Sequence, residues 1–424
     1  MTFTRTARNK GRAGAARWWI AVGVLVTAGA GCSLLDKGLE ATAPDKIETS
    51  TLEVPANAGL IVNSAIGNFE CALGTYIIDA GMMSGELMDA TATAANWAFD
   101  RRDTDPTADT RYATNDCTSY GLYTPLQIAR GTSDRALELL QGWTDTEVPN
   151  RQDLIAKAAA YDGYSILLIG EAFCEGAINL SGLMTSNDLF AAAEAKFTTA
   201  ITAAQAAHDN QILNMAYVGR ARARLDAGNK AGAATDAALV PPGFVMNATA
   251  ENSPTRRQNR VYTFNQAGVV SVAPAYRSLG DPRVTVTNAG KNGTDNRTAL
   301  YVQTKYGTSS TPIPIASYKE AQLILAEAQG GQTAVNIINA FHAAAGLPPF
   351  QSTDATAITN QIAQERAREL FLEGQHLYDV RRLNLPLVPA PGTPYSTVYL
   401  KGGNYGTQRC FPLPDVERLN NPNI

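Results

Sequence analysis

Histidine is the scarcest metal-binding residue type in this chain, with three copies in 424 residues. Cysteine is nearly as scarce, and the spacing of its five copies fits no zinc-binding pattern. Because zinc sites are built mainly from these two residue types, a resident metal ion is not expected. The sequence therefore predicts no metal centre and no cofactor.

Motifs of the common catalytic sites are also missing. The chain has no Gly-x-Ser-x-Gly elbow, no phosphate-binding glycine loop followed by lysine, and no His-Glu-x-x-His helix. A glycosidase needs only two carboxylates about 5 to 9 Å apart, which scattered Asp and Glu residues could supply in any fold. The sequence thus predicts a protein that is not an enzyme, with a surface glycoside hydrolase as the catalytic alternative.

Positive charge is in short supply outside the N-terminus. Residues 1–31 carry five basic residues and no acidic one, so the rest of the chain has 30 basic against 39 acidic residues, a net charge of −9. A surface of that sign repels phosphates, which argues against nucleic acid as a partner. Hydrophobic residues make up 45% and charged residues 17% of the chain, which is ample for a packed core.

The first 31 residues have the pattern of a secretory signal peptide. The basic residues precede an apolar run from Trp18 to Ala30. This run is shorter than the roughly 20 residues that a helix needs to cross a bilayer. We therefore expect residues 1–31 to be removed on export.

A cysteine stands at the end of this run. Segment 29–32, Gly-Ala-Gly-Cys, resembles a bacterial lipoprotein box, although its glycine stands where leucine is usual. We expect lipidation of Cys32 and a tether over residues 32–55, because more than one acyl chain anchors a protein stably to a membrane. Ser33 follows the cysteine, where aspartate would favour the inner membrane, so outer-membrane sorting is expected. The alternative is ordinary cleavage and a soluble periplasmic product.

Four further cysteines lie in the exported part of the chain, where disulfides can form. They are Cys71, Cys117, Cys174 and Cys410. Four cysteines allow three pairings, among which the sequence cannot choose. A Cys71–Cys117 disulfide is favoured, because both residues lie in the N-terminal region.

Helical periodicity dominates the middle of the chain, where small residues recur as in tetratricopeptide-type repeats of about 34 residues. The expected helices are Leu122–Trp143, Arg151–Phe173, a third after residue 185, Ile212–Ala227 and Asn229–Leu239. The first is expected to break near Gly131, and the third to be capped by Ser186 or Asn187. Gly228-Asn229 is expected to end the fourth as a left-handed stop. A mostly α fold is predicted, with a helical repeat core over residues 122–240 and 315–383. An ordinary helical bundle is the alternative.

Two long segments lose this period, at residues 90–121 and 241–312. The first reads as an exposed loop, and the second contains short β-like pieces at residues 261–264, 284–286 and 299–302. Ordered loops of this length usually carry function. We therefore expect these segments to form the ligand-binding region.

Aromatic residues within these segments are the candidates for ligand binding. A flat ring stacks on the apolar face of a sugar while neighbouring amides, carboxylates and guanidinium groups bond its hydroxyls. The first choices are Trp97, Tyr301 and Tyr306, and the polar neighbours of Trp97 are Asn96, Asp100, Arg101 and Arg102. Each ring taken singly could instead anchor its loop.

A highly charged segment follows near the C-terminus, within an expected long helix from Thr353 to Leu383. Its acidic and basic residues alternate at helical spacing, which predicts a structural network of ion pairs rather than a catalytic carboxylate pair. The expected members are Glu365, Arg366, Glu369, Glu373, Asp379, Arg381 and Arg382.

The same segment carries a family resemblance. The pairs Glu-Arg at 365–366, Glu-Leu at 369–370, Glu-Gly at 373–374, Tyr-Asp at 378–379 and Arg-Arg at 381–382 precede Phe-Pro-Leu-Pro at 411–414 and the ending at 417–423. This pattern resembles the RagB/SusD family of outer-membrane nutrient-uptake lipoproteins. One departure is His376, where the family usually has arginine, so one ion pair is expected to be missing or pH-dependent.

The resemblance implies a fold and a function. Residues 56–424 would form a single SusD-like domain, a helical array with long irregular insertions. The protein would sit on the cell surface by its lipid anchor, capture oligosaccharides, and deliver them to a SusC-like TonB-dependent barrel in the outer membrane. A peptide-capturing lid of the same transporter type and, from other classes, a glycoside hydrolase or an envelope scaffold are the alternatives.

Overall fold

The computed structural model describes residues 49–253, 256–395 and 401–424. The expected signal peptide, Cys32 and most of the expected tether lie outside the described residues. The chain divides into two compact units, residues 1–52 and 53–424. In the first, one short helix is described, α2 (Thr49–Leu52). None of the described helices combines the length and the apolar character that crossing a membrane requires.

The second unit is organised around α3 (Ala58–Ser84), which follows the short 3-10 helix η1 (Pro55–Asn57). From Phe69 onward every residue of α3 is buried, as expected for a helix that is apolar on all sides. The helix ends at Gly85, whose φ of 83° is the left-handed conformation that glycine adopts without strain.

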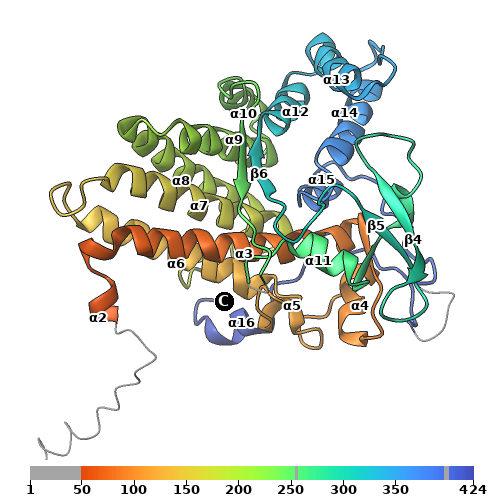
Figure 1. Ribbon diagram of the computed structural model, residues 1–424, viewed down its shortest axis with the longest axis horizontal. Coiled ribbons are helices and arrows are strands. Elements are labelled where there is room, and N and C mark those ends of the chain that lie inside the picture. The colour runs from red at the N-terminus through yellow and green to blue at the C-terminus, as the bar shows by residue number, and fades with distance from the viewer. Residues whose placement is uncertain (1–48, 254–255, 396–400) are drawn as a thin grey trace, which may run out of the picture. The chain divides into compact units, whose positions relative to one another are not determined.

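Six further helices continue the packing from α3, as Figure 1 shows. They are α6 (Tyr123–Gly142), α7 (Arg151–Ala172), α8 (Ser186–Ala207), α9 (Asn210–Asp226), α10 (Lys230–Ala237) and α12 (Tyr318–Gln329). Of these, α6 and α7 pack against α3, and each of the others packs against the one before it. This arrangement confirms the mostly α fold class. The expected break near Gly131 is absent, because α6 runs through that residue without interruption.

Small residues set the spacing of the stack, as the alanine- and glycine-rich pattern predicts. Phe197 of α8 lies between Gly163 of α7 and Gly219 of α9. A Cβ atom added at Gly163 or Gly219 would stand 2.8 or 2.4 Å from the Phe197 ring, which is closer than non-bonded atoms approach. Both glycines are therefore needed for the close approach of the three helices.

The ends of these helices follow local capping rules. Thr185, one residue before the expected cap, is the N-cap of α8 and forms a capping box with Asp188. Asp209 accepts hydrogen bonds from Gln211 and Ile212 at the start of α9. The predicted stop at Gly228 is confirmed, with φ of 82°.

The predicted long helix over Thr353–Leu383 is wrong. The chain forms two helices, α14 (Ala355–Glu369) and α15 (His376–Arg382), after α13 (Gly331–Ala345). The turn between them has Leu372 and Gly374 in left-handed conformation, with φ of 56° and 89°. A Cβ atom at Gly374 would lie 2.7 Å from the Tyr76 ring, so the chain turns there to pack against α3.

The expected loop at residues 90–121 is also more ordered than predicted. It contains α4 (Ala94–Arg101) and α5 (Arg111–Thr114), after the strand β1 (Leu87–Asp89). The expected β-like piece at 261–264 belongs to the helix α11 (Arg260–Gln266), because Asn259 caps its first turn. The preference of its β-branched and aromatic residues for strands is outweighed by this cap and by packing on α3.

Three small antiparallel pairs of strands complete the described unit. β1 pairs with β3 (Val270–Val272), β2 (Val245–Ala248) pairs with β6 (Ile313–Ser317), and β4 (Val286–Asn292) pairs with β5 (Ala299–Gln303). The remaining elements are η2 (Pro274–Tyr276) and α16 (Asp415–Asn420).

Two disulfides join distant parts of the unit. Cys71 in α3 bonds to Cys117, the pairing favoured from the sequence, with Cα atoms 5.5 Å apart. Cys174, just after α7, bonds to Cys410, with Cα atoms 5.1 Å apart. Beside the second disulfide, backbone hydrogen bonds join Phe411 to Ala172 and Cys174, at 2.8 and 2.9 Å. The C-terminal segment is therefore fixed to the end of α7.

Candidate functional site

The acidic residues of the C-terminal helices are paired with cations from several elements. Arg283 bonds Asp281 at 2.7 Å and contacts both Glu365 and Glu369. Lys319 of α12 bonds Glu369 at 2.7 Å. Glu365 and Glu369 lie on α14, so these pairs join that helix to the segment after η2 and to α12.

Asp379 is the centre of a second group of ion pairs. Its carboxylate bonds Arg366 at 2.8 Å and Arg382 at 2.6 Å, and Arg382 also contacts Glu327 of α12. Burial alone raises the pKa of Asp379, but the two guanidinium groups outweigh it and lower the pKa to about 2. The carboxylate is therefore charged at neutral pH.

Two members of the predicted network have other roles. Glu373 lies in the turn and bonds Lys305 at 2.5 Å. Arg381 forms no ion pair within the described residues; it donates instead to the Phe173 carbonyl at 2.9 Å and to Ser186 Oγ at 3.0 Å. Its predicted place in the ion network is wrong, because Arg381 faces the end of α7 and the start of α8.

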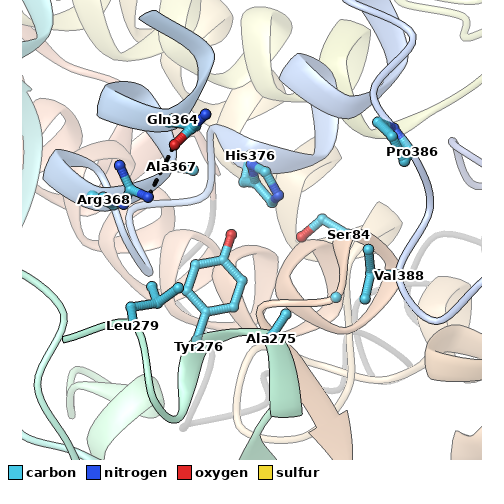
Figure 2. A pocket seen from close by; sticks show the side chains of 11 residues that line it. Ser84, Ala275, Tyr276, Leu279, Gln364, Ala367, Arg368, His376, Pro386 and Val388 are labelled. Carbon is cyan, nitrogen blue, oxygen red and sulfur yellow. Dashed lines mark hydrogen bonds between the residues drawn. The ribbon is translucent and has the colours of Figure 1, made fainter. Parts of the chain in front are cut away.

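His376 lines a hollow of about 200 Å³ beside this network, shown in Figure 2. Burial lowers the pKa of His376, and its Nδ1 atom has no hydrogen-bond partner among the described residues. The side chain makes no ion pair in this part of the chain. The ion pair that an arginine at position 376 would form is therefore missing from the described residues.

Trp97, the first choice for ligand binding, is half-buried on α4. Its Nε1 atom donates to the Thr91 carbonyl at 3.0 Å, which fixes the ring. Lys401 Nζ lies 6.0 Å from the ring centroid, within the range of a cation–π contact. The ring therefore has a set orientation and a partly accessible surface.

The polar residues next to Trp97 are engaged within the protein. Asn96 accepts from Arg111 at 2.8 Å, and Asp100 accepts from the Tyr395 hydroxyl at 3.0 Å. Asn96, Asp100 and Arg102 are all buried. Their expected role in bonding ligand hydroxyls is wrong, because α4 turns Asn96 and Asp100 inward and the residue after the helix, Arg102, is buried as well.

Tyr301 and Tyr306 differ sharply in accessibility. Tyr301 lies half-buried on β5 with the Arg277 guanidinium 4.1 Å from its ring centroid. Tyr306 is only 2% exposed, and its hydroxyl donates to the Leu372 carbonyl at 3.0 Å. Tyr306 is a core residue, so its predicted ligand contact is wrong.

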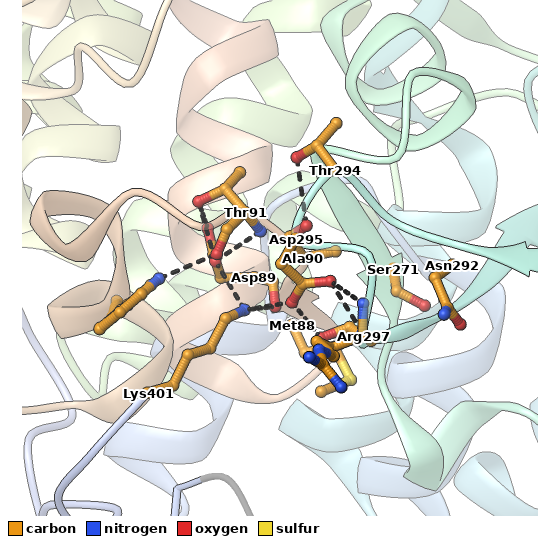
Figure 3. A network of polar contacts seen from close by, with 12 residues as sticks. Met88, Asp89, Ala90, Thr91, Ser271, Asn292, Thr294, Asp295, Arg297 and Lys401 are labelled. Carbon is orange, nitrogen blue, oxygen red and sulfur yellow. Dashed lines mark hydrogen bonds and ion pairs between the residues drawn. The ribbon is translucent and has the colours of Figure 1, made fainter. Parts of the chain in front are cut away.

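A buried lysine joins three segments near Trp97 (Figure 3). Lys401 Nζ lies 3.1 Å from Asp89 Oδ1, 2.8 Å from the Asp89 carbonyl and 3.0 Å from Asp295 Oδ2. Burial raises the pKa of Asp89, although Lys401 and Thr91 partly offset this. The lysine thus connects the C-terminal region to β1 and to the turn between β4 and β5.

A cleft of about 320 Å³ lies beside this network. Among the described residues, its lining includes two arginines and no acidic residue. The charged, hydroxyl-bearing and aromatic residues of its lining are Arg277, Arg297, Thr298, Thr393, Tyr395 and Tyr405. The arrangement offers donors and aromatic surface, which suit a ligand with many hydroxyl groups.

Several of these residues escaped the sequence analysis. Lys401 and Asp89 are 312 positions apart, and neither belongs to a recognisable motif. Tyr395 and Tyr405 stand in a Pro- and Gly-rich stretch of the sequence, where their aromatic character is the signal that indicates them. Arg277 carries no sequence signal at all.

The comparisons with known proteins agree with this architecture. Residues 284–423 match the model of the SusD family. No curated protein sequence matches the chain. Among solved structures, a SusD-like carbohydrate binding protein from Bacteroides vulgatus has a TM-score of 0.65 at 15% identity, covering 88% of this chain and 97% of the other.

Two further structures are similar to the same extent. A SusD superfamily protein from Parabacteroides distasonis has a TM-score of 0.63 at 14% identity, covering 89% of this chain and 98% of the other. A laminarin-binding SusD-like protein has a TM-score of 0.63 at 15% identity, covering 87% and 98%. The fold is therefore that of the SusD-like helical arrays. The C-terminal segment, residues 284–423, matches the SusD family, in agreement with the resemblance that the sequence motifs carry.

Proposed function

We propose that this protein is a non-catalytic, cell-surface lipoprotein that captures oligosaccharides and delivers them to a SusC-like TonB-dependent transporter. The SusD family match over residues 284–423 supports this role, as do a carbohydrate-binding and a laminarin-binding structure among the similar proteins. The expected lipid at Cys32 would supply the membrane anchor.

The observation that carries the proposal is the grouping of Trp97, Tyr301 and the arginine-lined cleft around one buried ion network. Lys401 joins Asp89 of β1 to Asp295 of the β4–β5 hairpin, which carries Tyr301. The Asp89 N–H donates to Asp100 of α4 at 2.9 Å, which connects the helix that carries Trp97. A rigid platform of this kind binds a sugar at low entropic cost, because its aromatic groups are already oriented.

The test is binding and turnover by the purified mature protein with a glycan panel that includes laminarin. We expect binding without cleavage, measured by calorimetry and by chromatography of the incubated glycans. Trp97→Ala should weaken the affinity for the bound glycan at least about tenfold, since aromatic stacking contributes roughly 1.5 kcal/mol. Tyr217→Ala is the control, because Tyr217 is a half-buried aromatic residue on α9 of the helical stack.

Other outcomes decide between the alternatives. Cleavage of a glycan would favour the glycoside hydrolase. Binding of peptides but of no glycan would favour the peptide-capturing lid. Equal glycan affinity of Trp97→Ala and the unmodified protein would remove the Trp97 surface as the site. Co-purification of a TonB-dependent barrel from the outer membrane tests the transporter partner.

A further inference from the structure

The hollow lined by His376 is formed by other residues than the proposed glycan site around Trp97 and Tyr301. It is formed where the end of α3, η2 and the helices α14 and α15 meet, and it shares no lining residue with the arginine-lined cleft. Its volume of about 200 Å³ lies below the roughly 300–1,000 Å³ of sites for drug-sized ligands, so a ligand here is limited to about one ring.

A buried phenol points into this hollow. Tyr276 is 7% exposed, and its ring stacks on Phe371 with the centroids 4.9 Å apart. Its hydroxyl has no hydrogen-bond partner among the described residues, and Figure 2 shows it directed into the space between Gln364, His376 and Ser84. The hydroxyl is not among the fully buried unpaired atoms of the described residues, because it faces the open space of the hollow. The open space beside it is where a ligand group can supply that partner.

Other polar groups surround the same space. The Ser84 hydroxyl makes one long hydrogen bond, of 3.4 Å, to the Gly81 carbonyl. Gln364 lies at the exposed rim and uses its carbonyl oxygen to accept from Arg368 at 3.1 Å. The hollow therefore presents a hydroxyl group on one side and an amide at its entrance.

The charges around the hollow are already matched. Arg368 lies 3.4 Å from Asp281 and 3.9 Å from Glu365, so its positive charge is compensated. Burial lowers the pKa of His376 and raises that of Tyr276, so both are neutral at pH 7. An ionic ligand would find no unmatched counter-charge here and would lose its hydration. An uncharged ligand has no such penalty.

The rest of the lining is apolar. Ala275, Leu279, Ala367, Pro386 and Val388 contribute carbon surface, and Leu279 and Val388 are exposed at the surface. Neutral hydrogen-bonding groups on one side and carbon surface on the other match a ring that carries hydroxyl groups and an apolar face. We propose that this hollow is a second ligand site, which binds one uncharged, hydroxyl-bearing ring of the size of a monosaccharide.

The experiment is a titration of the full mature protein with glucose, galactose, mannose and glucuronate at millimolar concentrations, followed by NMR. At least one uncharged sugar should bind more tightly than glucuronate. Tyr276→Phe should weaken that binding at least about tenfold, because it removes the unpaired hydroxyl and keeps the stacked ring. Ala367→Leu should abolish it by filling the hollow.

Two controls separate this site from the Trp97 surface. Tyr301→Phe removes a hydroxyl from the other site, and Trp97→Ala removes its main ring; monosaccharide binding here should survive both. Unchanged binding in Tyr276→Phe, stronger binding of glucuronate, or no binding of any tested sugar would overturn the inference. Loss of binding in Trp97→Ala alone would assign the sugar to the other surface and would also overturn it.

Discussion

Arg222 and Glu171 form a bidentate ion pair inside the helical stack. Arg222 Nε and Nη2 each donate to one oxygen of the Glu171 carboxylate, both at 2.6 Å. The Tyr76 hydroxyl donates to the same carboxylate at 2.9 Å. All three residues are buried, and Arg222 also lies 3.7 Å from the buried Glu320 of α12, so these contacts fix α9, α7 and α3 to one another.

Removing one partner of this pair should be costly. We expect Arg222→Met to lower the free energy of unfolding by about 3–5 kcal/mol, because it leaves a buried carboxylate without its cation. The measurement is urea denaturation followed by circular dichroism. Arg135→Met is the control: Arg135 pairs with Glu53 and Glu138 at the surface, and its loss should cost less than about 1 kcal/mol. Similar losses in both variants would contradict the prediction.

Asp100 should make stability depend on pH. Burial raises its pKa from 3.8 to about 7, so the folded protein binds this proton more tightly than the unfolded chain does. The stability that this tighter proton binding adds to the folded state is fully present below pH 3.8 and is lost as the pH rises through 7. Asp100→Asn keeps an oxygen that can accept from Asp89 and Tyr395, and it cannot ionise.

The comparison needs unfolding free energies of both proteins between pH 5 and 9. We expect the stability of Asp100→Asn relative to the unmodified protein to rise over this range, by on the order of 1–4 kcal/mol. Glu86, whose pKa burial raises to about 8, contributes equally to both proteins and cancels in the difference. A constant difference across the range would show that Asp100 does not titrate there.

Tyr306 should matter for stability and not for ligand binding. Tyr306→Phe leaves the Leu372 carbonyl without the hydroxyl that now donates to it, so unfolding should become easier by about 1–2 kcal/mol. Glycan affinity, measured by calorimetry, should stay unchanged. A loss of affinity without a loss of stability would restore Tyr306 as a binding residue.

The two disulfides should differ in their contributions. Replacing Cys174 and Cys410 by serine opens a loop of 236 residues, whereas replacing Cys71 and Cys117 opens one of 46. Because loop-closure entropy grows with loop length, the first double variant should lose about 1.5 kcal/mol more than the second. Thermal unfolding of both variants without reducing agent measures this, and an equal or reversed order would contradict it.

The parts of the fold that the sequence predicted are those set by neighbouring residues. The limits of α7 and α9 follow from apolar periodicity, and the end of α9 follows from Gly228. The break between α14 and α15 was missed because its cause, the packing of Gly374 on Tyr76, lies across the fold.

The candidate site was predicted only in part, for the same reason. Trp97 and Tyr301 have unusual residue types for their segments, and both proved accessible. Tyr306 is also a tyrosine of an irregular segment, but it is buried, and its hydroxyl donates to the Leu372 carbonyl in the turn between α14 and α15. Lys401 had no local signal, since its carboxylate partners Asp89 and Asp295 come from two distant segments.

The attachment of the C-terminal segment to α7 has a consequence for biogenesis. A chain that emerges from its N-terminus presents Cys174 long before Cys410, which lies 236 residues later. Until then Cys174 can react with Cys71 or Cys117, both of which are already present. Correct maturation therefore depends on early formation of the Cys71–Cys117 bond, and a host lacking a disulfide isomerase should accumulate mispaired protein.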